Sequence, residues 1–335
     1  TADADDLISF SGSDMTVGSS YETHIYTGDT YAPGANVSTG KLHVVGDYSG
    51  STETLTLTGS GTSTSRPLYV DGGTFTAPTT TVYQGSADSS IDNQTYNNLS
   101  FTPTITGATA YTFLGASSVN GDLTLNPTAS TSQTLTVNLG GSLILPSSGT
   151  LTLTGTTSGL STLDTASGSN YSIQSGYVNI GGAGTLTANN STITLTGTSG
   201  TLFTETGTFT SGGSTVVVNP DTAVTVFSGA PTLFNLSLTP TITADRTYSL
   251  GSALTIDGDF TINPTASSAF NLTAEMGGDI TAAVTSTTTV TGTTSGLSTL
   301  DTASGSNYAL STGLMSITSG TFNANDSNVT FTGTT

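Results

Sequence analysis

Side chains that could carry out catalysis are scarce in this sequence. Its two histidines, His24 and His43, belong to no motif with metal-ligand spacing, so we interpret both as surface or turn residues. A Ser-His-Asp site needs three groups held in one constellation. Because the chain has 47 Ser, the presence of Ser near a histidine carries no information. The absence of Cys excludes disulfides, thiolate nucleophiles and Cys-ligated zinc sites.

Paired carboxylates could support glycoside hydrolysis, which uses two Asp or Glu side chains beside the bond that breaks. The candidates are Asp3, Asp5, Asp6 and Asp14, and the pair Asp257 and Asp259. Asp257 has no acidic counterpart in the related earlier segment, where Asn120 stands instead, and basic residues are nearly absent beside the acids. We therefore predict that the protein is not an enzyme and has no catalytic residues and no cofactor.

Calcium binds carboxylate and carbonyl oxygens, so the recurring Gly-Asp pairs are candidate ligands. These pairs contain Asp47, Asp122, Asp259 and Asp279. None belongs to an EF-hand loop or to the dense nonapeptide pattern of calcium-binding β-helices. We interpret them as tight turns that precede strands, and we leave open whether the protein has a metal site.

Threonine arrays raise the possibility of ice binding, because a flat ladder of Thr on a β-solenoid can match an ice lattice. The arrays are Thr54/Thr56/Thr58, Thr150/Thr152/Thr154 and Thr192/Thr194/Thr196. Thr is also simply the outward residue of a strand whose other face is apolar. Because the arrays do not return in every repeat, we keep an ice- or carbohydrate-binding module as an alternative function.

The overall composition excludes several classes of protein. The 335 residues include 75 Thr, 47 Ser and 41 Gly, and the net charge is -19. Three cations, Lys41, Arg66 and Arg246, cannot neutralise a nucleic-acid backbone, so we predict no nucleic-acid partner. No apolar run approaches the roughly 20 residues of a membrane-spanning helix, so we predict no membrane span. The many β-branched residues favour strands, and helix formers are few.

A long internal repeat dominates the sequence, with a constant offset of 137 positions. Segments 98–106, 121–130 and 155–171 return at 235–243, 258–267 and 292–308. We divide the chain into residues 1–70, which are an end module or diverged coils, a first long repeat at 71–197, and an incomplete second long repeat at 198–335. A constant offset indicates duplication without insertion.

A shorter period of roughly 20 to 23 residues lies inside the long repeat. Each unit holds short runs with apolar residues at every second position, as at 150–154, and these runs are separated by turn residues. Tandem β-sandwich domains would also give such strands. Neighbouring units resemble one another only when each fills the same cross-section, so we predict a parallel β-solenoid. About 15 coils stacked about 4.8 Å apart would form a rod on the order of 70 Å long.

Several motifs carry a resemblance to a known class of proteins. They include Asn98-Leu-Ser-Phe101, Gly121-Asp-Leu-Thr-Leu-Asn-Pro-Thr-Ala-Ser130 and Gly184-Thr-Leu-Thr-Ala-Asn189. Residues 71–335 resemble the repeats of large secreted bacterial β-solenoid surface proteins, similar in kind to filamentous haemagglutinin and autotransporter passenger domains. The resemblance implies an extracellular structural or adhesive protein at the cell surface, with a surface glycan or host cell as its contact. Open β-edges favour head-to-tail self-association or continuation within a longer chain.

Overall fold

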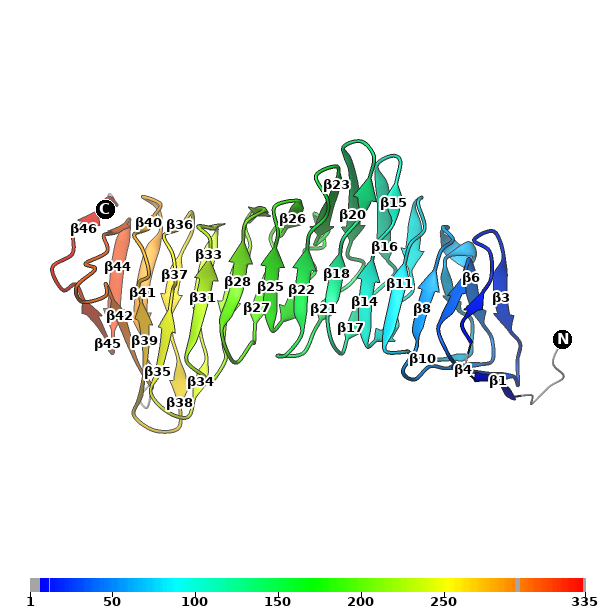
Figure 1. Cartoon of the computed structure of the whole chain (residues 1–335). Coiled ribbons are helices and arrows are strands. Elements are labelled where there is room, and N and C mark those ends of the chain that lie inside the picture. The colour runs from blue at the N-terminus through cyan, green and yellow to red at the C-terminus, as the bar shows by residue number, and fades with distance from the viewer. Residues whose placement is uncertain (1–6, 12, 293–295, 334–335) are drawn as a thin grey trace. The chain divides into compact units, whose positions relative to one another are not determined.

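The protein folds as a parallel β-solenoid of about 13 turns, nearly all β and with essentially no helix (Figure 1). The computed structural model describes residues 7–11, 13–292 and 296–333. A single 3₁₀ turn, η1 (Ser63–Ser65), accompanies the strands in this part of the chain. The predicted fold class is therefore confirmed, and the alternative of tandem β-sandwiches is wrong.

The coils are fewer and more variable in length than the sequence predicted. Thr30 pairs with Asp47 across a short coil, whereas Ile280 pairs with Leu310 across a much longer one. The predicted unit of roughly 20 to 23 residues describes only some coils. Longer coils explain why the turns number about 13 rather than 15.

The chain packs as two compact units. Unit 1 comprises 1–145, 149–166 and 182–185, and unit 2 comprises 146–148, 167–181 and 186–335. These units are defined by packing, whereas the predicted segments 1–70, 71–197 and 198–335 were defined by sequence repetition.

Unit 1 holds six series of hydrogen-bonded strands. The longest series comprises, in order, β2 (Met15–Thr16), β5 (Val37–Thr39), β8 (Thr54–Leu57), β11 (Thr80–Tyr83), β14 (Asn98–Phe101), β18 (Leu123–Leu125) and β22 (Thr150–Leu153). Two lie nearer the N-terminus: β1 (Leu7–Ser11), β4 (Thr30–Gly34), β7 (Asp47–Ser49), β10 (Thr74–Thr76); and β3 (Glu22–Ile25), β6 (Lys41–Val44), β9 (Leu68–Val70). The others are β12 (Ser89–Ile91), β16 (Thr109–Phe113), β20 (Gln133–Asn138), β23 (Gly159–Asp164); β13 (Thr95–Tyr96), β17 (Ser117–Val119), β21 (Leu143–Ile144); and β15 (Thr104–Ile105) with β19 (Thr128–Ala129).

Unit 2 holds four series. Two have seven strands each: β25 (Tyr177–Ile180), β28 (Thr201–Glu205), β31 (Val224–Ser228), β35 (Arg246–Ser249), β39 (Phe270–Glu275), β42 (Gly296–Asp301), β45 (Gly320–Asn323); and β24 (Ile173–Ser175), β27 (Thr192–Leu195), β30 (Thr215–Val218), β33 (Asn235–Leu238), β37 (Phe260–Ile262), β41 (Thr287–Thr291), β44 (Leu314–Thr318). The others are β32 (Thr232–Leu233), β36 (Leu254–Ile256), β40 (Ile280–Ala282), β43 (Leu310–Thr312), β46 (Val329–Phe331); and β34 (Thr241–Ile242) with β38 (Thr265–Ala266). Strand β29 (Thr208–Thr210) belongs to unit 2, and β26 (Gly184–Thr187) contains residues of both units.

Alternating side chains build the core of each unit. In β22, Leu151 and Leu153 are fully buried, whereas Thr150 and Thr152 on the other face are half-buried. This follows from the period of two along a strand, which sends successive side chains to opposite faces. The largest fully buried side chains are aromatic: Tyr48, Tyr83, Tyr96, Tyr111, Tyr248, Phe101, Phe113, Phe203, Phe227 and Phe260. The apolar residues of each coil therefore meet those of the next inside the solenoid.

The long repeat builds the same strand pairings twice. Leu99 pairs with Leu123 in unit 1, and Leu236 pairs with Phe260 in unit 2, at equivalent positions of the two repeats. The hydroxyls of Thr104 and Thr128 lie 3.0 Å apart, and their counterparts Thr241 and Thr265 lie 2.9 Å apart. The duplicated sequence therefore reproduces the register between coils as well as the strands.

Buried tyrosines predict how the fold responds to alkaline pH. Burial, and then the charge of Glu53, raise the pKa of Tyr31 from 10.0 to about 12, and the same causes raise the pKa of Tyr48 further. The folded state thus holds the phenol proton more tightly than the unfolded chain. This stabilisation is complete below pH 10 and is lost as the pH rises through the raised pKa.

We expect unfolding and ionisation of the buried tyrosines to occur together well above pH 10, as followed by circular dichroism and tyrosinate absorbance. The Tyr48→Phe variant should unfold at higher pH than the parent, because it removes an ionisable hydroxyl that has no hydrogen-bond partner. Complete ionisation of the tyrosines near pH 10 with the β-sheet signal intact would contradict this expectation.

Candidate functional site

Asn and Asp side chains form a polar ladder that joins one coil to the next. The backbone N–H of Asp122 donates to Asn98 Oδ1 at 2.9 Å, and the backbone N–H of Thr150 donates to Asp122 Oδ1 at 2.9 Å. The Asn98 amide also donates to the carbonyl of Thr79 at 2.9 Å. Each side chain therefore satisfies a backbone donor close to where a strand of the following coil begins.

The same ladder recurs in unit 2. Asp259 donates its backbone N–H to Asn235 Oδ1, and Thr287 donates its backbone N–H to Asp259 Oδ1, both at 2.8 Å. These residues occupy the repeat positions equivalent to Asn98, Asp122 and Thr150. Asn36 makes a similar link earlier in unit 1, where its backbone N–H donates to Asp14 Oδ1 and its own Oδ1 accepts the N–H of Thr54.

This ladder explains the Gly-Asp pairs at Asp122, Asp259 and Asp279, whereas Asp47 is exposed at the start of β7 and is not part of the ladder. A Cβ at Gly121 would lie 2.3 Å from Asn98 Oδ1, so only glycine lets the asparagine of the preceding coil approach the backbone. The aspartate that follows continues the ladder, and Asp279 likewise accepts the N–H of Ala309 at 2.9 Å. The pairs precede strands β18, β37 and β40, and the carboxylates that were candidate calcium ligands there accept backbone N–H groups.

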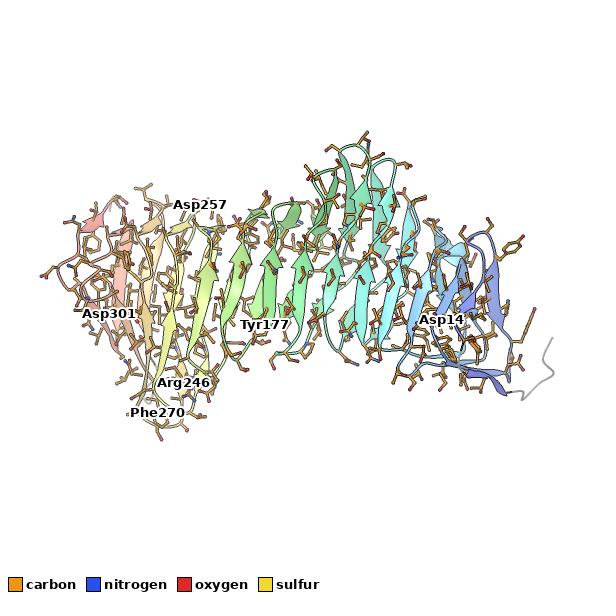
Figure 2. The ribbon with its side chains drawn as sticks, viewed as in Figure 1. Asp14, Tyr177, Arg246, Asp257, Phe270 and Asp301 are labelled. Atoms are coloured by element: carbon orange, nitrogen blue, oxygen red, sulfur yellow. The ribbon has the colours of Figure 1, made fainter. Side chains whose placement is uncertain are left out.

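Two of the carboxylates that could support glycoside hydrolysis accept backbone N–H groups instead. Asp3, Asp5 and Asp6 lie outside the described residues. Asp14 belongs to the polar ladder, and Asp257, which follows β36, is exposed (Figure 2). Asp259, two positions further on, is engaged with Thr287. Backbone capping therefore accounts for Asp14 and Asp259.

The first two threonines of each array lie on strands β8, β22 and β27, the third directly follows the strand, and their side chains are half-buried or exposed. Across coils, the outward positions form in-register rows of small side chains. In unit 1 one row is Ser38, Thr56, Val82, Ser100, Thr124 and Thr152. In unit 2 one row is Thr194, Val217, Ser237, Thr261, Thr289 and Ser316. Each row is interrupted by serine and valine and is not a continuous Thr ladder.

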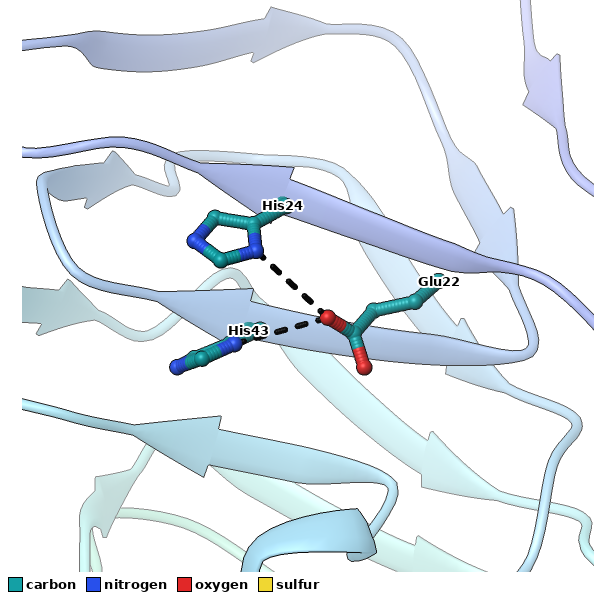
Figure 3. Close-up of side chains that lie close together, drawn as sticks. All are labelled: Glu22, His24 and His43. Atoms are coloured by element: carbon teal, nitrogen blue, oxygen red, sulfur yellow. Dashed lines mark ion pairs between the residues drawn. The ribbon is translucent and has the colours of Figure 1, made fainter.

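A second cluster brings together both histidines and one glutamate (Figure 3). Glu22 and His24 are separated by one residue on β3, so they share a face of the strand. His43 on β6 is the register partner of His24. Among the described residues, this His-Glu cluster is a group of three His or carboxylate side chains whose ligand atoms all lie within 4.8 Å of one another.

The geometry of the His-Glu cluster converges on one oxygen. His24 Nδ1 and His43 Nδ1 lie 3.6 Å and 3.4 Å from Glu22 Oε1. His24 stacks on Tyr26 with ring centroids 4.3 Å apart, and His43 stacks on Tyr69 at 4.5 Å. The two imidazoles are 4.2 Å apart and tilted by 45°. Stacking therefore fixes both rings with their Nδ1 atoms near the same carboxylate.

The interpretation of His24 and His43 as surface or turn residues is wrong. Both lie on strands, and their side chains are only 30% and 18% exposed. The signal that could have found them is the alternation Glu22-Thr-His24, combined with a short coil that brings His43 into register. That coil is shorter than the period found from the repeats.

Nearby charges leave the cluster acidic. Asp71 Oδ2 lies 3.7 Å from His43 Nε2. The Lys41 ammonium donates to the hydroxyl of Ser65. Arg66 lies over the ring of Tyr69 at 4.1 Å and pairs with Asp92 at 3.2 Å. Both cations are therefore engaged with other groups.

Comparisons with protein-family models, curated proteins and solved structures find no match for the chain. Among the described residues, no helix has the length and apolar character needed to cross a membrane.

The polar ladder predicts a specific coupling between Asn98 and Gly121. Gly121→Ala should lower the free energy of unfolding by about 1–3 kcal/mol, because the new Cβ displaces the Asn98 side chain. Asn98→Ala should cost about 1–2 kcal/mol for its lost hydrogen bonds. In the double variant the added Cβ should cost less, because the Asn98 side chain is no longer there to be displaced. Urea unfolding of the parent, the two single variants and the double variant would show this as non-additive changes in the free energy of unfolding.

Gly107→Ala is the matched control, because a Cβ at Gly107 meets no atom within 4 Å. We expect that substitution to leave stability unchanged or slightly raised. Strict additivity of the Asn98 and Gly121 substitutions would show that the ladder contact does not contribute as described.

Proposed function

We propose that this chain is an extracellular structural or adhesive protein, a segment of a surface fibre that assembles through open β-edges. The observation that carries the proposal is the coil-to-coil ladder, in which backbone strands and Asn-Asp side chains repeat the same axial contacts in both units. A repetitive architecture whose elements contact only their neighbours suits a mechanical role.

The charge distribution supports the same role. Only 7% of the residues are charged, and the net charge is -19. Arg66 and Arg246 are paired with Asp92 and Asp221, at 3.2 Å and 2.9 Å. The surface that remains is rich in hydroxyls and acidic, which keeps neighbouring fibres solvated and apart.

Strands β44, β45 and β46 supply the edge for assembly in this proposal. Each of them is the last member of its sheet among the described residues. Ile317 on β44 is 46% exposed, whereas Ile180, at the equivalent repeat position on β25, is buried and its strand pairs with β28. Phe331 on β46 is also exposed, by 60%. A further coil laid on this edge would bury these side chains and pair the free backbone groups.

The rows of small outward side chains favour a second candidate, an ice- or carbohydrate-binding module. Within the first row, Ser100, Thr124 and Thr152 present successive hydroxyls in register on β14, β18 and β22. This function would belong to a single, unassembled chain. Thermal hysteresis or glycan-array binding by that form would favour it over the fibre.

The fibre proposal predicts self-association that depends on the β44–β46 edge. We expect sedimentation velocity to show larger species as the concentration rises. Ile317→Glu should raise the concentration needed by about tenfold or more, the change that corresponds to about 1.4 kcal/mol of association free energy. The reason is that a charge would be buried without a partner at the interface.

Leu114→Glu is the matched control for this experiment. Leu114 is similarly exposed, at 47%, but it follows β16, which is paired with β12 and β20 on its two sides. We expect that variant to associate like the parent. A chain that stays monomeric at every concentration, or that associates equally well with Ile317→Glu, would contradict assembly through this edge.

A further inference from the structure

We infer that Glu22, His24 and His43 bind a divalent transition-metal ion of the zinc class. The inference does not rest on the proposed fibre function, because it concerns side chains on β3 and β6 rather than the β44–β46 edge. Two imidazole nitrogens and one carboxylate oxygen are a donor set that suits zinc, and such three-residue sets leave a further position for water.

The separations fit shared coordination better than direct hydrogen bonding. The two Nδ1 atoms lie 3.6 Å and 3.4 Å from Glu22 Oε1, beyond the usual range of an N–H···O hydrogen bond. With zinc–ligand bonds of about 2.0–2.1 Å, adjacent ligands of a tetrahedral ion lie about 3.4 Å apart. Each imidazole nitrogen is therefore spaced from the carboxylate oxygen as two ligands of one ion are, and the three ligand atoms all lie within 4.8 Å of one another.

The surroundings orient the rings for this role. His43 Nε2 is buried and has no hydrogen-bond partner, and Asp71 Oδ2 lies 3.7 Å away from it. At that distance Asp71 adds negative charge beside the site but does not hydrogen-bond to His43. Tyr26 stacks on His24 and Tyr69 stacks on His43, so each imidazole has an aromatic neighbour that restrains it.

The charge balance and the exposure also favour a cation. Glu22 is 41% exposed and His24 is 30% exposed, so an ion can enter from solvent and keep a bound water. Lys41 is the register partner of Glu22, yet its ammonium is bonded to Ser65. Among the described residues, Glu22 forms ion pairs with the two histidines and with no lysine or arginine.

A bound ion would join two successive coils. Glu22 and His24 lie on β3 and His43 lies on β6, the next strand of the same sheet. The unfolded chain holds no such preformed site, so the ion binds the folded state preferentially and raises the melting temperature.

Isothermal titration of the full chain with zinc, after removal of metal by a chelator, tests the inference. We expect one zinc per chain. Glu22→Gln, His24→Gln and His43→Gln should each weaken binding by about tenfold or more. Asp257→Asn, which removes an exposed carboxylate elsewhere, is the matched control and should bind like the parent.

X-ray absorption spectroscopy of the zinc-loaded parent chain gives a test that does not depend on whether any variant folds. The expected result is a coordination shell with two imidazoles and oxygen ligands. Absence of zinc binding, a shell without imidazole, or unchanged affinity in the three ligand variants that retain the parent circular dichroism would overturn the site.

Discussion

Parallel pairing of each strand with the strand one coil away is the constraint on which this structure depends. Parallel strands cannot be joined by a tight hairpin, so the remainder of each coil serves as the crossover. The crossover is short between Thr30 and its partner Asp47, and much longer between Ile280 and its partner Leu310. The connections between strands absorb this difference, while the strands keep their register.

Register also explains the side-chain features of both units. Asn98 reaches the N–H of Asp122 because the two positions are brought together by the pairing of β14 with β18, and Gly121 leaves the space that the amide needs. The same rule brings His24 beside His43. One axial pattern therefore produces a stabilising ladder at some positions and a potential ligand set at another.

Much of the fold could be predicted from the sequence, because its determinants are local or exactly repeated. Alternation within segments such as Thr150–Leu153 indicated strands with one buried face, and the constant offset of the long repeat indicated duplicated coils. Coil length could not be predicted, since nothing local fixes how many residues a loop contains. The His-Glu cluster was missed for the same reason: its formation depends on a short coil that brings His43 onto His24.

We propose that coils of this chain continue their stacking from one molecule to the next. X-ray diffraction from an aligned, concentrated preparation of the full chain tests this most directly. Continuous stacking predicts a reflection at about 4.8 Å along the long axis of the assemblies, because strands then lie across that axis. Diffuse scattering from separate particles, or the same reflection perpendicular to the axis, would contradict the claim.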